Sequence, residues 1–134
     1  MSNMKKFMIR EQAQKSTRVY LVDPATSAIT EDWVDVRSSL SDEFIDARNL
    51  LAGEASEWNP DKEARKRESK ERQLRLKAAL VSGWSFQEEC NEENVVTFLR
   101  EAPQVGEMLL NVADDGSRFF AGPSTGSASG QKPK

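Results

Sequence analysis

Side chains that could carry out acid–base, nucleophilic or metal chemistry are scarce in this 134-residue chain, which contains no histidine and one cysteine, Cys90. Histidine is the commonest general base and the commonest metal ligand, so Ser–His pairs, Cys–His pairs and histidine-based zinc sites are excluded. Before residue 116 the glycines are Gly53, Gly83 and Gly106, too far apart to form a phosphate-binding loop. The sequence therefore predicts that the protein is not an enzyme and uses no cofactor.

The densest group of carboxylates surrounds Cys90 and consists of Glu88, Glu89, Glu92 and Glu93. These groups could bind a hard cation, but a calcium loop also needs alternating oxygen ligands and a glycine at its sharp turn. Acidic residues equally stabilise the start of a helix through its dipole, and we prefer this interpretation, which predicts no metal site. Cys90 has no basic neighbour to lower its pKa, so we expect a half-buried apolar side chain.

Charge is distributed unevenly around a net value of −3. Residues 60–84 carry eight bases and four acids, whereas residues 85–122 carry two bases and eight acids. The bases are Lys62, Arg65, Lys66, Arg67, Lys70, Arg72, Arg75 and Lys77. They could contact a phosphate backbone, but acids lie among them and no aromatic residue is available to stack on bases. We prefer a solvated, self-paired helix, in which Glu63–Arg67, Glu68–Arg72 and Glu71–Arg75 pair at four-residue spacing.

The N-terminal half predicts a β-hairpin followed by a helix. Residues 1–16 are weakly patterned, with at most a short strand at 7–9, and we expect weak order there. Residues 18–22 (RVYLV) and 33–37 (WVDVR) have the composition of strands, and residues 23–27 (DPATS) have that of a turn. Ser41 is a good N-cap for a helix whose apolar positions recur at helical spacing: Phe44, Ala47, Leu51, Ala55 and Trp58.

A long helix is predicted from Asp61 to Val81, after Asn59 as its cap and Pro60 at its first turn. Gly83 is expected to end this helix. Trp84 and Phe86 follow at once, and we interpret these two aromatic side chains with Gly83 as a structural hinge of the core. Trp84 and Phe86 could alternatively form an exposed binding spot.

Two amphipathic helices and a tail complete the chain. Asn91 is predicted to cap a helix at 92–102, and Pro103 opens a second at 104–113. Residues 122–134 are rich in glycine, serine and proline, which predicts a disordered, flexible tail. We therefore expect one α+β domain at 17–121, an N-terminal β-hairpin on a mainly α-helical body. No signal peptide or membrane span is expected, so we predict a cytosolic protein without membrane contact.

The C-terminal half resembles the tail assembly chaperones of long-tailed bacteriophages. The resemblance rests on LVSGWSF at residues 80–86, on NEENV at residues 91–95 in front of a short helix, and on RFF at residues 118–120. In that family a strand-rich N-terminus and a charged helix precede these motifs. Two features depart from the pattern: Glu92 follows the cap where proline is common, and residues 1–16 have no counterpart.

This resemblance implies a non-structural assembly factor of the host cytoplasm. Such a factor binds the phage tape-measure protein, keeps it soluble and promotes polymerisation of the tail-tube protein around it. It is then absent from the mature virion. Some family members also exist as a longer, frameshifted form. Self-association is compatible with the sequence.

A chaperone of a long apolar chain must offer reversible apolar contacts. The residues that could offer them are Val105, Met108, Leu109, Val112, Phe119 and Phe120, with the adaptable Met108 as the best candidate. The same side chains could instead form the core, and the sequence does not divide them between the two uses. Two other functions stay open: a small nucleic-acid-associated phage protein that uses residues 61–77, and a minor structural component of the virion tail or neck.

Overall fold

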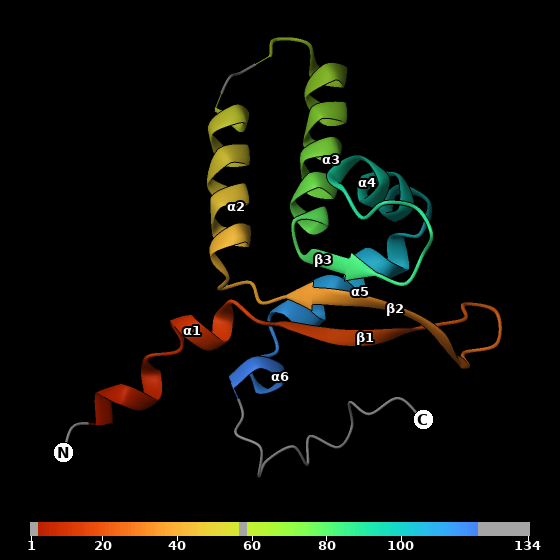
Figure 1. Ribbon diagram of the computed structural model, residues 1–134. Coiled ribbons are helices and arrows are strands. Elements are labelled where there is room, and N and C mark those ends of the chain that lie inside the picture. Colours follow the sequence, from red (N-terminus) through yellow and green to blue (C-terminus); the bar gives the residue numbers. More distant parts are fainter. Residues whose placement is uncertain (1–2, 57–58, 121–134) are drawn as a thin grey trace.

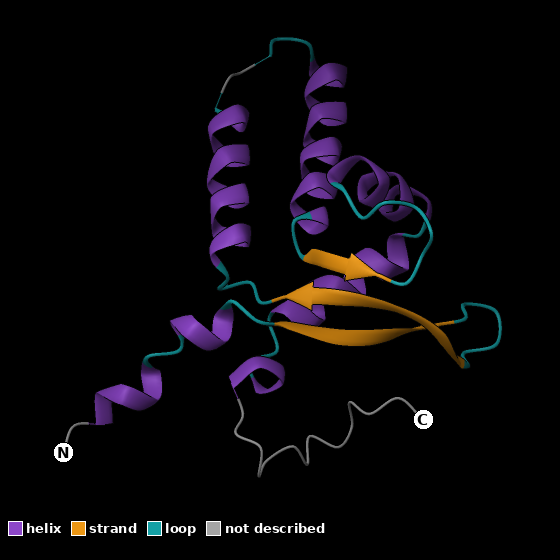
Figure 2. Cartoon of the chain, in the orientation of Figure 1, coloured by secondary structure: helices purple, strands orange, loops and turns teal. Residues whose placement is uncertain are grey.

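A three-stranded antiparallel sheet lies at the centre of the chain, in the order β1–β2–β3, and α5 lies across one of its faces (Figure 1, Figure 2). The computed structural model describes residues 3–56 and 59–120. In chain order the elements are η1 (Asn3–Phe7, a 3-10 helix), α1 (Arg10–Ala13), β1 (Ser16–Val22), β2 (Ile29–Arg37), α2 (Asp42–Ala55), α3 (Lys62–Ala78), β3 (Val81–Trp84), α4 (Glu92–Glu101), α5 (Pro103–Ala113) and α6 (Ser117–Phe120). The fold class is α+β, as the sequence predicts.

The predicted hairpin is formed by β1 and β2, which pair from Ser16↔Arg37 to Val22↔Ile29 with one irregularity. Its turn uses the expected chemistry, since the Asp23 carboxylate accepts the backbone N–H of Ala25 at 2.8 Å. In front of the hairpin, however, the short strand predicted at residues 7–9 is wrong. These residues lie at the end of η1 and just before α1 instead.

The third strand, β3, replaces the predicted end of the long helix. Helix α3 ends at Ala78, and β3 pairs with β2 through Val34↔Trp84 and Asp35↔Gly83. Gly83 is therefore a strand residue and not the helix-ending glycine that the sequence suggested. The link between α3 and β3 is held by the sheet, because the Arg37 guanidinium donates to the O atom of the C-cap residue Ala79 at 2.8 Å and to Val81 O of β3 at 3.1 Å.

Side chains cap the starts of α2, α3 and α4. The Ser41 hydroxyl accepts the Phe44 N–H at 3.3 Å, and the Asn91 side chain accepts the Asn94 N–H at 2.9 Å, as predicted. Helix α3 differs, because Asp61 caps it and Asn59 instead accepts the N–H of Asp61 at 2.9 Å. Trp58 and the predicted tail at 122–134 lie outside the described residues.

Helices α2 and α3 stand side by side and form an arm that projects from the sheet (Figure 1). None of the three ion pairs predicted at four-residue spacing along α3 forms among the described residues, and Glu71 and Arg75 pair with other helices instead. Arg75 binds Glu54 of α2 at 2.8 Å and Glu92 of α4 at 3.3 Å, and Arg100 of α4 binds Glu71 at 2.8 Å. These exposed pairs orient the arm on the body and add little to stability.

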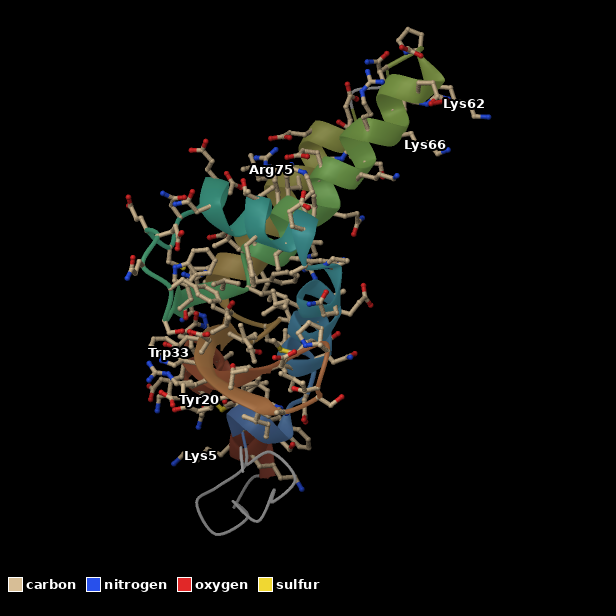
Figure 3. The ribbon with its side chains drawn as sticks, turned by 90° about the vertical axis from the view of Figure 1, so that its right-hand side faces the viewer. Lys5, Tyr20, Trp33, Lys62, Lys66 and Arg75 are labelled. Carbon is tan, nitrogen blue, oxygen red and sulfur yellow. The ribbon has the colours of Figure 1, made fainter. Side chains whose placement is uncertain are left out.

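The hydrophobic core lies between the sheet, the base of α3 and the two C-terminal helices. Its most deeply buried large side chains are Val34 and Val36 of β2, Leu80, Leu99 of α4 and Leu109 of α5. Alternate residues of the hairpin point the other way, and Figure 3 shows Tyr20 and Trp33 on the side of the sheet that faces away from α5. One face of the sheet therefore carries the core.

Leu109→Ala should lower the free energy of unfolding by about 2–5 kcal/mol, because Leu109 is 0% exposed and its removal leaves a cavity. Leu50→Ala is the matched control, since Leu50 is 61% exposed on α2 and its loss should cost less than about 0.5 kcal/mol. Urea denaturation followed by circular dichroism measures both. Equal effects of the two substitutions would contradict this assignment of the core.

Candidate functional site

Three of the six predicted partner-binding residues belong to the core. Val105, Leu109 and Val112 are buried on the inner face of α5, where they pack with the valines of β2 and with α4. A partner cannot reach them while the chain is folded. Of the two uses that the sequence left open for these three residues, the structure shows the core, because the sheet already covers their face of the helix.

The other three predicted residues are partly buried. Met108 packs against the core from the rim of α5, so a charge placed there would also disturb folding. Phe119 and Phe120 lie in α6 with their ring centroids 6.0 Å apart, and α6 packs against α1 and β1. These two rings therefore support the N-terminal segment, a role that the sequence did not indicate.

Four of the seven exposed large apolar side chains in the described residues belong to the N-terminal segment or lie just before α2, whereas Val22, Ile29 and Leu50 lie elsewhere. Met4 is 64% exposed, Phe7 71%, Met8 63% and Leu40 48%. Large apolar groups are seldom grouped in this way on the surface of a protein that has no partner. We therefore take this region as the candidate functional site. The sequence did not reveal it, because residues 4–8 lack a recognisable period and Leu40 is distant in the chain.

A groove of about 750 Å³ runs between the N-terminal segment and the start of α2. Its apolar lining consists of Phe7, Met8, Ile9, Ala13, Leu40 and Ile45, and we call this set the N-terminal groove. Ala13 is buried and Ile9 and Ile45 are partly buried, so they line its inner part, whereas Phe7, Met8 and Leu40 are exposed. The groove is open to solvent and offers mainly carbon surface to a ligand.

Polar contacts hold the two walls of the N-terminal groove together. The Arg10 guanidinium lies 2.7 Å from the Asp42 carboxylate, and the Gln14 side chain accepts the backbone N–H of Asp42 at 3.0 Å. The same Gln14 amide donates to Arg10 O at 2.8 Å. Asp42 is the first residue of α2, so Gln14 satisfies one of the N–H groups that a helix start leaves free. The groove thus has a defined shape, with one basic side chain, Arg10, and two acidic side chains, Glu11 and Asp42, among its lining residues.

The predicted hinge residues form an aromatic cluster beside β3. The rings of Trp84, Phe86 and Phe98 lie 5.2–5.8 Å apart, and the Trp84 indole donates to Glu88 O at 2.8 Å. Trp84 and Phe86 are partly buried, which lies between the hinge of the core and the exposed binding spot that the sequence left open. They join β3 to α4, and they also line a pocket of about 260 Å³.

The carboxylates around Cys90 do not converge. Glu92 turns to Arg75, whereas Glu88, Glu89 and Glu93 are exposed, and no group of acidic or cysteine side chains within residues 3–56 and 59–120 is arranged to hold a metal ion. Cys90 is partly buried, and burial raises the pKa of its thiol, although the nearby Arg37 charge acts in the opposite direction. The thiol is therefore less nucleophilic than a free cysteine at neutral pH.

A second hollow, between α2 and α3, is smaller than the N-terminal groove and is lined mainly by charged groups. It has a volume of about 650 Å³, and its lining includes Glu54, Glu68, Glu71, Arg72 and Arg75. Arg75 already binds Glu54, and Glu71 already binds Arg100. We interpret this hollow as the gap between two charged helices of the arm rather than as a ligand site.

Comparison of the chain with protein families, curated proteins and solved structures gives no match. Within the described part of the chain, no helix has both the length and the apolar character needed to cross a membrane. The function must therefore be argued from the surface of the molecule.

Cys90 should react more slowly with iodoacetamide in the folded chain than in the urea-unfolded chain, by several-fold near pH 8. Burial and the raised pKa of the thiol both reduce the amount of accessible thiolate. Mass spectrometry over time measures the labelling, and Cys90→Ser provides the blank. Faster labelling of the folded chain would identify an activated thiol and contradict our interpretation.

Proposed function

We propose that this protein is a phage tail assembly chaperone that holds apolar helical segments of the tape-measure protein in its N-terminal groove. The observation that carries the proposal is the exposure of Phe7, Met8 and Leu40 around one groove. The resemblance of residues 80–86, 91–95 and 118–120 to the family supports it. The region of resemblance builds the body of the domain and α6, and α6 packs against α1.

The N-terminal groove suits an amphipathic helix that must be bound and later released. Helices are recognised by laying an apolar stripe into a groove of this kind. The Met8 side chain provides flexible and polarizable contacts, so the groove can accept successive segments of differing sequence. Arg10 and Asp42 at the margin can pair with charges on the polar sides of a bound helix. Because the groove is shallow and solvent-exposed, we expect each contact to be weak and reversible.

The proposed role places the protein in the host cytoplasm during assembly and outside the mature virion. It acts by binding alone, without catalysis or a cofactor. By keeping the tape-measure protein soluble, it would leave that protein available as a template on which tail-tube subunits polymerise. A minor structural component of the virion would instead be recovered in purified particles, and this is how that alternative is distinguished.

Co-expression with the tape-measure protein of the same phage should raise the soluble fraction of that protein. Met8→Asp and Leu40→Asp should each remove most of this effect, because they place a charge in the apolar groove. Both side chains are exposed, so the free energy of unfolding should change by less than about 1 kcal/mol. The soluble fraction is measured by sedimentation and immunoblotting of cell extracts.

Leu50→Asp is the matched control, since it makes the same substitution at an exposed leucine of α2 outside the groove. It should solubilise the tape-measure protein as well as the wild type does. If all three variants behave alike, the groove is not the binding site. If the wild type does not solubilise the tape-measure protein, the chaperone function itself is refuted.

A further inference from the structure

The outer half of α3 carries a row of lysines without ion-pair partners. Lys62, Lys66 and Lys70 follow each other at four-residue spacing, so they lie along one side of the helix, and all three are exposed. We call them the lysine stripe, and Figure 3 shows Lys62 and Lys66 at the free end of the arm. None of the three forms an ion pair with any residue in the described ranges 3–56 and 59–120.

Opposite charges remain unpaired beside the aromatic pocket. The rings of Trp84, Phe86 and Phe98 line this pocket together with Glu88. Glu89 follows Glu88 in the sequence, and Glu93 precedes Asn94, another lining residue. The Asn94 side chain, which also lines the pocket, donates to Glu89 O at 2.9 Å, and Glu93 lies one turn before the lining residue Thr97. The three glutamates are exposed and have no ion-pair partner in the part of the chain that the structure describes. We call this surface the acid-rimmed pocket.

The two surfaces do not neutralise each other within one molecule. Where α3 and α4 are close enough, their charges do pair, as Arg75 with Glu92 and Arg100 with Glu71. These pairs lie on the inner half of α3, whereas the lysine stripe begins at the free end of the arm (Figure 1). Three lysines and three glutamates are therefore left over on separate surfaces of the same chain.

We propose that the lysine stripe of one copy docks on the acid-rimmed pocket of a second copy. The charges are complementary in sign and number, and the aliphatic stems of lysines can lie on the aromatic rings of the pocket while their ammonium groups face the glutamates. The contact joins two different surfaces, so each copy keeps one of each free, and the assembly extends as a ring or an open chain. This proposal concerns other residues than the N-terminal groove and does not depend on the chaperone function.

A nucleic acid is the other ligand that a lysine stripe could attract, and the surroundings disfavour it. Glu63, Glu68 and Glu71 lie on the same helix, and the sequence of α3 itself contains no aromatic residue. On the sheet, Trp33 is already covered, because the Arg18 guanidinium lies 3.4 Å from its ring centroid and also binds Asp35 at 2.9 Å. A protein surface with carboxylates fits the stripe better than a phosphate backbone does.

Sedimentation velocity over a concentration series tests the proposal with the full chain. Wild-type protein should self-associate at an ionic strength of about 0.01 M, and the association should weaken by about tenfold or more at about 1 M, where exposed charges are screened. The triple variants Lys62→Glu/Lys66→Glu/Lys70→Glu and Glu88→Lys/Glu89→Lys/Glu93→Lys should each stay monomeric. An equimolar mixture of the two should associate again, because every contact then joins opposite charges. Circular dichroism confirms that both variants are folded.

A control separates a specific contact from the effect of net charge. Lys5→Glu/Lys6→Glu/Lys15→Glu makes the same change in charge at exposed lysines outside the stripe, and it should self-associate like the wild type. The proposal is overturned if wild type stays monomeric at low ionic strength, if the mixture fails to associate, or if this control loses association equally. It is also overturned if the stripe variant loses binding to duplex DNA while self-association is unchanged. Every substitution lies outside the groove-lining residues, and sedimentation measures self-association directly, so failure of this proposal is distinguished from failure of tape-measure solubilisation.

Discussion

Burial of Val34 and Val36 in the centre of the sheet is the constraint on which the other elements depend. Strand β2, which carries both valines, bonds to β1 on one side and to β3 on the other, and it packs on α5. Its end is fixed as well: Arg37 donates to the carbonyls of Ala79 and Val81, where α3 leads into β3, and the Ser39 N–H donates to Ala113 O at 3.0 Å. The direction of the arm and the position of α5 thus follow from a single buried strand.

This constraint also decides which apolar side chains are left for a partner. The hydrophobic share of the chain is 37%, below the usual 45–50% or so of a globular domain. The sheet and the base of α3 need the inner faces of both C-terminal helices to close the core, so Val105, Leu109 and Val112 are not available. The N-terminal segment contributes Ala13 to the buried set but leaves Phe7 and Met8 in solvent. The exposed apolar surface of the groove therefore lies in the part of the chain that the core does not use.

The features that the sequence predicted correctly depend on local chemistry. Asp23 in a turn, and Ser41 and Asn91 at helix starts, bond to N–H groups two or three residues away, and such bonds can be read from neighbouring residues alone. Strand β3 was missed because four residues, one of them glycine, are too short to show alternation, and only the pairing with β2 makes them a strand.

Features that join distant segments could not be predicted. The acids that bind Arg75 come from residues 54 and 92, so the four-residue spacing along α3 indicated the wrong partners. The N-terminal groove combines Met8 with Leu40 and Ile45, and neither stretch has a pattern of its own. Exposure, which distinguishes a binding surface from a core, is a property of the whole fold and is not encoded in the local period of α5.

The separation of the groove from the lysine stripe has a consequence for a long partner. The groove lies at the base of α2, whereas the stripe begins at the far end of the arm, so one copy can engage a helix and a second copy at the same time (Figure 1). A weak groove contact becomes effective when neighbouring copies are linked, because the second binding event then takes place at a high local concentration. Many weak sites in a row would cover an extended apolar helix and still release it step by step. On this physical ground, a charged arm and a shallow apolar groove in one small domain form a consistent pair for binding a long chain temporarily.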